Sequence, residues 1–255
     1  MIIRIIWLKI KGKKPFQKYP NLVEYVSNLT ARKSPNNLRF DSKNMTITWY
    51  GLSSFKITAK DITIITDPFD SKTGLSPVRG GADIVILSNP GLESSSNVSS
   101  ITGEPFVVSG PGEYDVKGIF IIGSAAENQA LGPNTIYCLE VEDIRIAFIG
   151  AFNQSQLTDE QREALEGADI VLVPIGGKDI LDYEHAAKIA TQLEPYYIVP
   201  HSYKTQGVTV PLDKLDNFIK EMGGKPTEAE RITVKKKDFT AETTTVIVLE
   251  PQRWK

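Results

Sequence analysis

The chain has 255 residues, of which 41% are hydrophobic and 24% are charged, and its formal net charge is −2, a composition typical of a globular protein. One cysteine, Cys138, and two histidines, His185 and His201, exclude an internal disulfide and any zinc site built from four cysteines or three histidines. No apolar run reaches the ~18 residues of a membrane span, and a chain without disulfides fits the cytoplasm, where we expect this protein.

Residues 1–44 are strongly basic. They contain ten Lys or Arg and two acidic residues, a charge of +8, so the remaining residues carry −10. A basic arm on an acidic body is typical of contact with nucleic acid or a membrane surface, and the other interpretation is a terminus of solvated lysines. Residues 34–44 are rich in turn formers and indicate a linker. We therefore predict an N-terminal extension over 1–44, either disordered or not translated because translation starts at Met45, and one domain over 45–255.

The domain begins with short β patterns. Segments 45–50, 54–59 and 61–67 follow one another with very short links, which predicts an antiparallel meander. The continuous apolar run at 82–88 is typical of a buried strand. Further strands are predicted at 104–109, 118–123, 134–141 and 143–150, with Glu142-Asp143 as a tight hairpin and the glycines of 110–118 as turn glycines.

Helical patterns begin near residue 157. Thr158 and Gln161 match a capping box, which predicts a helix that ends near Gly167. The remaining predicted elements are helices at 182–194 and 212–223 and strands at 168–175, 196–200, 231–234 and 244–250. Strand meanders with a few helices in one unit predict stacked sheets flanked by helices.

Several ordered segments carry a family resemblance over roughly residues 45–250. They include ITWYGLSSFKI (47–57), DITIITDPFD (61–70), ADIVILS (82–88), GPGEYDVKGIFIIG (110–123) and YYIVPHSYK (196–204). In order and spacing they resemble the metallo-β-lactamase superfamily, in particular its bacterial branch of zinc-dependent hydrolases related to ascorbate-phosphate lactonase. The resemblance implies an α/β (α+β) fold, a four-layer αββα sandwich with its site at one edge between the sheets. It also implies zinc as cofactor and, because many members associate, a homo-oligomer.

The metal-ligand positions of that family are occupied by other residue types here. The family supplies a His-x-His-x-Asp-His loop and later His, Asp and His residues. In this chain the loop positions hold Asn89, Gly91, Glu93 and Ser94, and the next histidine would fall near Ala126 or Glu127. The bridging aspartate is replaced by Ala151, and the last histidine by Ser202, with His201 one place before it. An opening histidine of the family's pattern is replaced by Leu52. Asp67 matches the family, and Glu93 is a partial substitute.

Zinc requires nitrogen, sulfur or carboxylate donors, and two carboxylates alone would hold Mg²⁺ or Ca²⁺ weakly. We therefore predict no catalytic residue, no metal ligand and no cofactor. The candidate degenerate pocket comprises Asp67, Asn89, Glu93, Ser94, Glu127, Ala151, His201 and Ser202. Within it, Asp67 is interpreted either as a remaining site residue or as a cap that bonds backbone N–H groups of the turn before Pro68. His201 is interpreted either as a site residue or as a structural hydrogen-bonding group.

Three functional hypotheses follow. The first is a non-catalytic member of the superfamily, a pseudoenzyme, that binds a small molecule or a protein partner. The second is a hydrolase of unknown substrate with a reorganised site, which predicts that Asp67, Glu93, His201 and Ser202 converge in one pocket. The third is a protein that binds nucleic acid or a partner through the basic residues 1–44.

Overall fold

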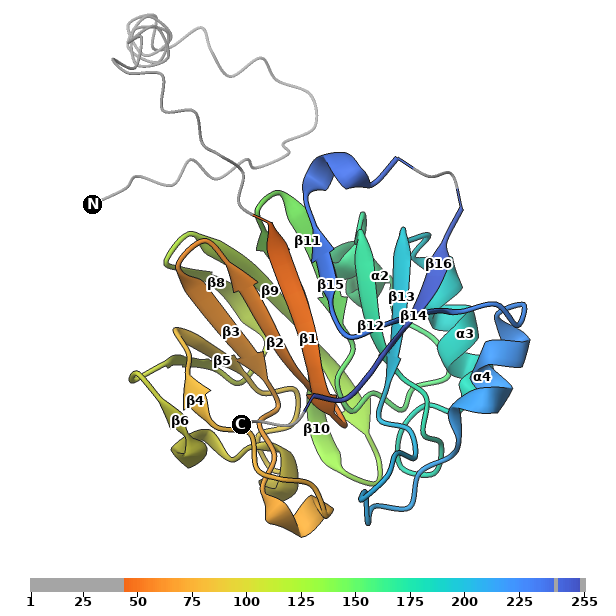
Figure 1. The fold of residues 1–255 in the computed structure, drawn as a ribbon, viewed down its shortest axis with the longest axis horizontal. Helices are drawn as coiled ribbons and strands as arrows, with labels where there is room; N and C mark the ends of the chain where they lie inside the picture. The colour runs from red at the N-terminus through yellow and green to blue at the C-terminus, as the bar shows by residue number, and fades with distance from the viewer. Residues whose placement is uncertain (1–43, 241–242, 253–255) are drawn as a thin grey trace, which may run out of the picture. The chain divides into compact units, whose positions relative to one another are not determined.

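The computed structural model describes residues 44–240 and 243–252, and within these it leaves the side chain of Glu93 undescribed. The predicted extension over 1–44 therefore lies outside the described residues, apart from Asn44, and stays a prediction. Two large sheets face each other (Figure 1). One has the order β15-β1-β2-β3-β5-β7 and the other has the order β14-β16-β13-β12-β11-β10-β9-β8.

The six-stranded sheet contains the predicted meander. Its strands are β1 (Met45–Gly51), β2 (Ser54–Ala59), β3 (Ile62–Thr66), β5 (Ile84–Ile86), β7 (Phe106–Val108) and β15 (Ile232–Val234). β1, β2 and β3 pair antiparallel, and β5 and β7 continue parallel to β3. Along β1 the side chains of Met45, Ile47 and Trp49 are buried and alternate with half-buried ones, so one face of the sheet lies on the core.

The eight-stranded sheet supplies the other wall of the core. Its strands are β8 (Gly112–Val116), β9 (Ile119–Asn128), β10 (Gly132–Val141), β11 (Ile144–Phe148), β12 (Ile170–Pro174), β13 (Tyr197–His201), β14 (Thr227–Ala229) and β16 (Thr245–Leu249). β11, β12 and β13 are parallel. The Glu142-Asp143 hairpin is confirmed, and both residues have positive φ, 52° and 62°, as a tight two-residue turn requires.

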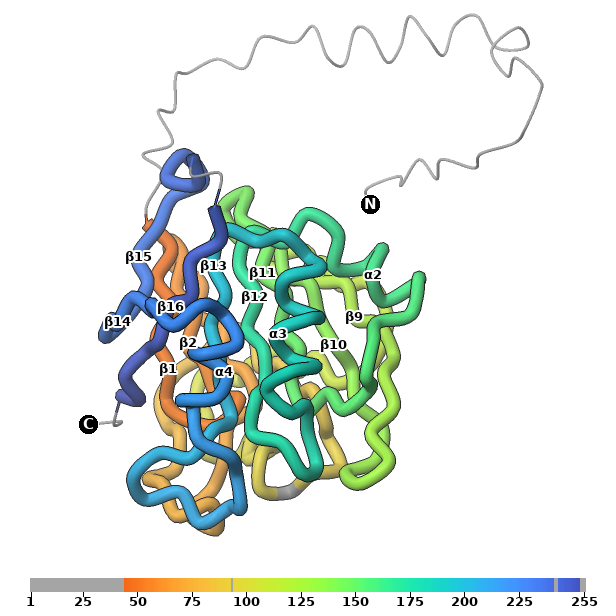
Figure 2. Tube along the Cα trace, turned by 90° about the vertical axis from the view of Figure 1, so that its right-hand side faces the viewer, coloured from red at the N-terminus to blue at the C-terminus, as the bar shows by residue number. Residues whose placement is uncertain are grey.

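Three α-helices cover the outer face of the eight-stranded sheet (Figures 1 and 2). They are α2 (Asp159–Leu165), α3 (Tyr183–Gln192) and α4 (Leu215–Glu221), and α3 and α4 lie side by side. The predicted capping box on α2 is confirmed: Thr158 Oγ1 accepts from Gln161 N at 3.2 Å, and Gln161 Oε1 accepts from Thr158 N at 3.0 Å.

Residues 69–102 cover the outer face of the six-stranded sheet. They form the 3-10 turns η1 (Ser71–Thr73), η2 (Glu93–Ser95) and η3 (Val98–Ser100) and the short strands β4 (Gly80–Gly81) and β6 (Ile101–Thr102); η4 (Lys236–Asp238) lies elsewhere, between β15 and β16. This layer encloses a second apolar cluster that contains Ile65, Phe69 and Val85. The αββα fold class expected from the sequence is confirmed, and on this face the outer layer is made of tight turns.

The sequence-based boundaries were wrong at two neighbouring strands. Residues 110–118 contain the edge strand β8 as well as turn glycines, because Gly112 pairs with Gly123 of β9. A Cβ at Gly123 would lie 2.8 Å from Gly110 O, so only glycine allows these two backbone segments to come this close. β9 also runs five residues beyond its predicted end, because Ser124–Asn128 pair with β10 although they are small or polar.

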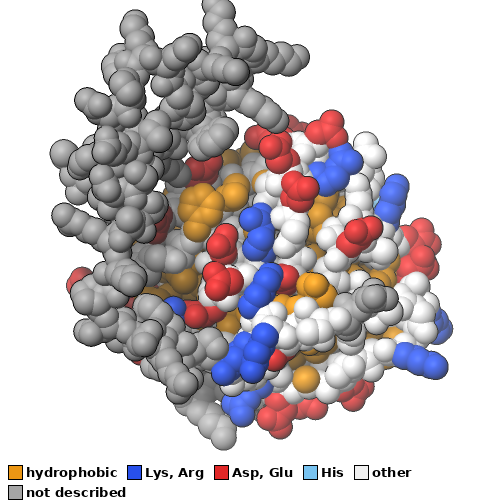
Figure 3. Space-filling model, turned by 90° about the horizontal axis from the view of Figure 1, so that it is seen from above, with side chains coloured by type: hydrophobic (Ala, Val, Ile, Leu, Met, Phe, Trp, Pro, Cys, Tyr) orange, Lys and Arg blue, Asp and Glu red, His pale blue; other side chains and the backbone are white. Residues whose placement is uncertain are grey.

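The surface carries both signs of charge. On the face seen in Figure 3, the side chains of Lys and Arg are interspersed with those of Asp and Glu. That face offers no single-sign area of the kind that nucleic acid selects, among the residues the structure describes. A helix long and apolar enough to cross a membrane is absent from the described part of the chain.

Candidate functional site

A cavity of about 140 Å³ lies at one edge of the sandwich, where the loops that follow β1, β5, β11, β12 and β13 meet, at the lower edge in Figure 1. Most of its wall is aliphatic. The lining residues are Leu52, Ser53, Leu92, Ser94, Ser95, Leu131, Gly150, Ala151, Gly177, Asp179, Ile180, Ser202, Val210, Pro211 and Leu212. Leu52, Leu92 and Leu131 are only half-buried, which places apolar side chains at the mouth of the cavity.

Three of the eight candidate pocket residues line this cavity. Ser94 comes from the loop after β5, Ala151 from the turn after β11, and Ser202 from the first residue after β13. Leu52, which stands at the opening histidine of the family pattern, lies in the same wall. Positions more than 100 residues apart in sequence thus meet where the resemblance implies a metal site.

Asp67 is 1% exposed and does not line the cavity. Its Oδ1 accepts from Ser88 N at 2.7 Å and its Oδ2 accepts from Ser88 Oγ at 2.6 Å, so both carboxylate oxygens hold the start of the loop after β5. Burial raises the pKa of Asp67 to about 6, and the hydrogen bonds from Ser88 and Ser53 oppose that shift. These contacts are structural, but they hold Ser88 and not the turn before Pro68 that the sequence suggested.

Asn89 also has a structural role. Its Nδ2 donates to Leu131 O at 2.8 Å, and its Oδ1 accepts from Gly91 N at 3.1 Å. The side chain therefore ties the loop after β5 to the β9–β10 turn. Glu127 is exposed and borders a separate open groove beside Gln154, away from the cavity. The side chain of Glu93 lies outside the described residues, and its role stays a prediction.

His201 is the last residue of β13 and is fully buried. Its ring packs against Phe55 and Phe148, with centroid distances of 5.5 and 6.1 Å. Its Nδ1 lies 2.9 Å from Ser202 Oγ, whereas its Nε2 has no hydrogen-bond partner of good geometry among the described residues. Burial lowers the pKa of His201 to about 3, and a backbone interaction with Leu172 opposes the shift only in part.

The backbone is strained where the walls of the cavity meet. Leu52 has φ 48° and Ser202 has φ 53°, a left-handed conformation that costs a non-glycine residue about 1–2 kcal/mol. Ser202 N donates to Leu52 O at 3.2 Å, and Trp49 Nε1 donates to the same carbonyl at 2.8 Å. These hydrogen bonds hold both residues in place, so the sandwich maintains this corner although the ligand side chains are different.

Asn128 is a positioning residue that the sequence analysis missed. It is 3% exposed and makes four hydrogen bonds at the end of β9. Its Nδ2 donates to Ala151 O at 2.6 Å and to Asp179 O at 2.8 Å, and its Oδ1 accepts from Ala130 N and Leu131 N, each at 3.0 Å. One side chain thus joins three segments of the cavity wall. An Asn at the start of a turn was the available signal, since this residue type often bonds backbone groups two residues ahead.

We expect Asn128→Ala to lower the free energy of unfolding by about 2–4 kcal/mol, because it leaves buried backbone groups of three segments without partners. The neighbouring exposed Gln129 provides the matched control, and Gln129→Ala should change stability by less than about 0.5 kcal/mol. Urea denaturation of the two variants and the wild type measures both values. Equal, small effects of the two substitutions would show that Asn128 does not hold the wall together.

The side chains at this corner do not fit a zinc ion. Zinc takes nitrogen, sulfur or carboxylate donors in a tetrahedron. Leu52, Ala151 and the serines of the cavity offer aliphatic carbon or hydroxyl groups instead, and Asp179 is the one acid among the lining side chains that the structure describes. Asp67 is bonded to Ser88 and does not line the cavity. Across residues 44–240 and 243–252, no three His, Cys, Asp or Glu side chains come close enough together to hold a metal ion.

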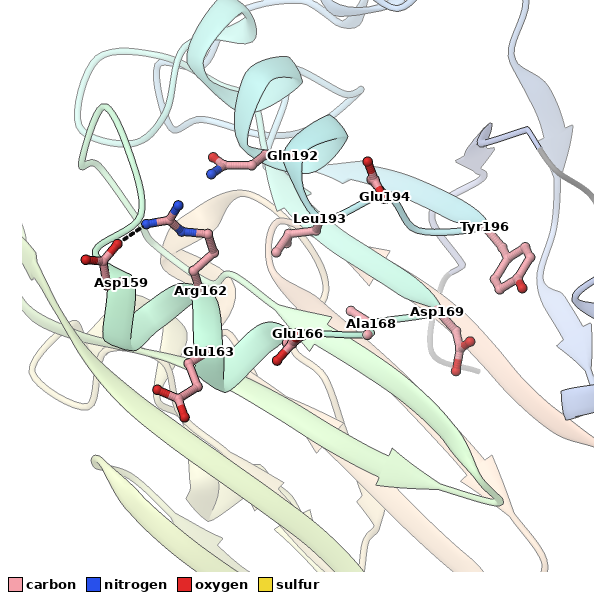
Figure 4. Close-up of a pocket in the computed structure, with 11 residues that line it drawn as sticks. Asp159, Arg162, Glu163, Glu166, Ala168, Asp169, Gln192, Leu193, Glu194 and Tyr196 are labelled. Carbon is pink, nitrogen blue, oxygen red and sulfur yellow. Dashed lines mark hydrogen bonds and ion pairs between the residues drawn. The ribbon is translucent and has the colours of Figure 1, made fainter. Parts of the chain in front are cut away.

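A second hollow lies outside the site, beside α2 and the end of α3. It is lined by acidic residues such as Glu163, Asp169 and Glu194 (Figure 4). These carboxylates point in different directions, and Arg162 pairs with Asp159. Asp169 already bonds Lys236 Nζ at 2.7 Å. The hollow is therefore an open polar surface without a converging set of groups.

Comparisons with known proteins agree on this fold. Residues 46–202 match a family model described as a β-lactamase superfamily domain. A UPF0173 metal-dependent hydrolase of Methanopyrus kandleri is 22% identical over an alignment of 201 residues, and the match covers 63% of this chain and 85% of that protein.

Solved structures show the same similarity. A Thermotoga maritima protein assigned to the zinc-dependent hydrolases of the metallo-β-lactamase superfamily has a TM-score of 0.68 and 28% identity, over 80% of this chain and 98% of its own. A metallo hydrolase of Ignicoccus hospitalis has a TM-score of 0.57 and 17% identity, over 82% of this chain and 96% of its own. The second likeness concerns the fold alone.

Proposed function

The chain belongs to the β-lactamase superfamily, and we propose that it is a member that binds a ligand at the family's metal corner without holding zinc or hydrolysing a substrate there. The observation that carries the proposal is the composition of the cavity wall. Leu52, Ser94, Ala151 and Ser202 line the cavity, and the resemblance implies that these positions hold metal-site residues in the family. A water molecule is activated by zinc only where a ligand set fixes the ion, so this wall would not support that chemistry.

The contacts around the cavity hold its shape, which favours a pocket that is still used for binding over a site that has only lost its function. Asn128 and Asn89 bond several loops to one another, and the strained residues Leu52 and Ser202 are kept in position by hydrogen bonds. Strained backbone persists only where its surroundings determine it, and it clusters at functional sites. A cavity maintained in this way is suited to binding.

A serine hydrolase at Ser202 is the alternative that one contact favours, the 2.9 Å distance between Ser202 Oγ and His201 Nδ1. The mechanism needs a base with a pKa near the working pH and a third group that orients it. The pKa of His201 is about 3, so its imidazole is a weak base at neutral pH. No carboxylate contacts its Nε2 among the described residues, and Asp67 is bonded to Ser88. The non-catalytic function is better supported.

We expect the full chain, titrated with Zn²⁺ in a calorimeter, to show no one-to-one binding at micromolar affinity. Chelator and stoichiometric zinc should both leave its thermal midpoint unchanged, because ligand binding to the folded state would raise it. Ala151→Leu, which fills the cavity, distinguishes this site from the surface. Stoichiometric zinc binding that raises the midpoint in the wild type and is lost in Ala151→Leu would refute the proposal.

A further inference from the structure

We propose that the cavity bounded by Leu52, Ala151 and Ser202 binds a compact, uncharged, largely apolar molecule with one hydrogen-bonding group, of the size and chemistry of a phenol. The inference rests on the proposed function and names the class of ligand. It follows from the volume of the cavity, its aliphatic wall and the serine hydroxyl groups among its lining residues.

The volume sets the size of the ligand. A dry, aliphatic cavity of ~150 Å³ accepts a molecule such as benzene, with about six non-hydrogen atoms. The volume here is about 140 Å³. Leu92, Leu131 and Val210 are half-buried at its mouth, so a ligand can enter without crossing the core. A molecule of about six to eight non-hydrogen atoms therefore fits.

The wall sets the polarity of the ligand. Leucine, isoleucine, valine and proline side chains form most of it, and they cannot solvate a charge. Asp179, half-buried in the wall, is the one acidic residue among the lining side chains that the structure describes, and its carboxylate disfavours an anion. A single carboxylate, already 4.0 Å from Lys178 Nζ, is not a cage for a cation either. Because both an anion and a cation are disfavoured, the ligand is neutral.

Two serines set the position of the polar group. The hydroxyl of Ser94 is half-buried and has no hydrogen-bond partner among the residues that the structure describes, although it lines the cavity. The hydroxyl of Ser202 shares one hydrogen bond with His201 Nδ1, which leaves it further bonding capacity. A ligand hydroxyl between these two groups can both donate and accept.

The test uses four probes with the full chain: phenol, toluene, benzoate and benzylammonium. Methyl resonances of the leucine and isoleucine side chains in the cavity wall report binding by nuclear magnetic resonance. We expect phenol to saturate with a Kd on the order of 0.1–1 mM, which is typical of a ligand this small. Toluene should bind several-fold more weakly, and the two charged probes at least about tenfold more weakly.

Two variants locate the site. Ala151→Leu should weaken phenol binding at least about tenfold because the added carbons fill the cavity, whereas Ala130→Leu adds the same carbons on an exposed residue and should change nothing. Ser94→Ala should bring the affinity for phenol down to that for toluene and leave toluene unchanged. Circular dichroism confirms that each variant is folded.

Specific outcomes overturn the inference. Absence of phenol and toluene binding in a zinc-free protein would refute the ligand class and leave the proposed function standing. Charged probes that bind as tightly as phenol, or phenol binding unaffected by Ala151→Leu, would likewise refute the ligand class and leave the proposed function standing. Zinc binding in the calorimeter that is lost in Ala151→Leu would instead refute the proposed function itself, so the two failures are distinguishable.

Discussion

Replacing His201 with asparagine should make the protein more resistant to acid: between pH 6.5 and 4.5 the variant should gain about 2 kcal/mol of unfolding free energy relative to the wild type. The unfolded chain protonates this histidine near the ordinary histidine pKa of 6.5, whereas the folded chain does so only near 3. The wild type therefore loses stability as pH falls through this window, by up to ~5 kcal/mol in total. Asparagine keeps a polar atom near Ser202 Oγ but does not titrate.

Asp67 acts in the opposite direction, which gives the experiment its control. Its pKa is about 6 in the folded protein and 3.8 in a solvated aspartate, so the folded state binds the proton more tightly. Its contribution stabilises the fold below about pH 4 and is lost as pH rises through about 6. Asp67→Asn should therefore make the protein more acid-sensitive than the wild type between pH 6 and 4, by ~1 kcal/mol per pH unit.

Urea denaturation at several pH values, referred to the wild type at each pH, separates these contributions from those of other carboxyl groups. A His201→Asn variant whose pH dependence matches that of the wild type would contradict the buried, neutral histidine. The absolute stability of each variant does not enter the comparison, because the cost of repacking next to Phe55 is the same at every pH.

Gly150→Ala should be strongly destabilising, with a loss of about 3–5 kcal/mol of unfolding free energy. Gly150 has φ 59°, and a Cβ built on it would lie 2.2 Å from Ser88 Cβ and 2.5 Å from Ser88 Oγ. Ser88 cannot withdraw without breaking its two hydrogen bonds to Asp67. Because Gly150 lines the cavity, the clash should also weaken ligand binding.

Gly118→Ala is the matched control. Gly118 has φ 82°, and a Cβ there would meet no atom within 4 Å, so only the backbone conformation is penalised, by about 1 kcal/mol. The difference between the two variants in urea denaturation isolates the contact with Ser88. If Gly150→Ala were as mild as Gly118→Ala, the tight packing of the two loops behind the cavity would be refuted.

Local patterns in the sequence predicted much of the fold. The Thr158–Gln161 capping box and the Glu142-Asp143 hairpin depend on residues three or one apart, and both are confirmed. The errors occur at strands whose existence or length is determined by pairing with a neighbouring strand and not by the local sequence. β8 and the end of β9 are held by partners across the sheet, so their glycines and polar residues do not look like strands in the sequence.

The site was predictable in position but not in composition. The resemblance placed Ser94, Ala151 and Ser202 together, and the structure brings them into one cavity. Asp67 and His201, predicted as pocket residues, do not line it and are bonded or packed groups. The apolar wall, which includes Ile180 and the segment 210–212, could not be foreseen. Those residues match no motif, and only the folded loops bring them to the cavity.

Diffraction from crystals grown with excess zinc, recorded on both sides of the zinc absorption edge, locates each bound ion and so shows whether this corner of the sandwich holds zinc. We expect no anomalous peak inside the cavity between Leu52, Ala151 and Ser202. A fully occupied peak there, coordinated by side-chain atoms of this chain, would contradict it.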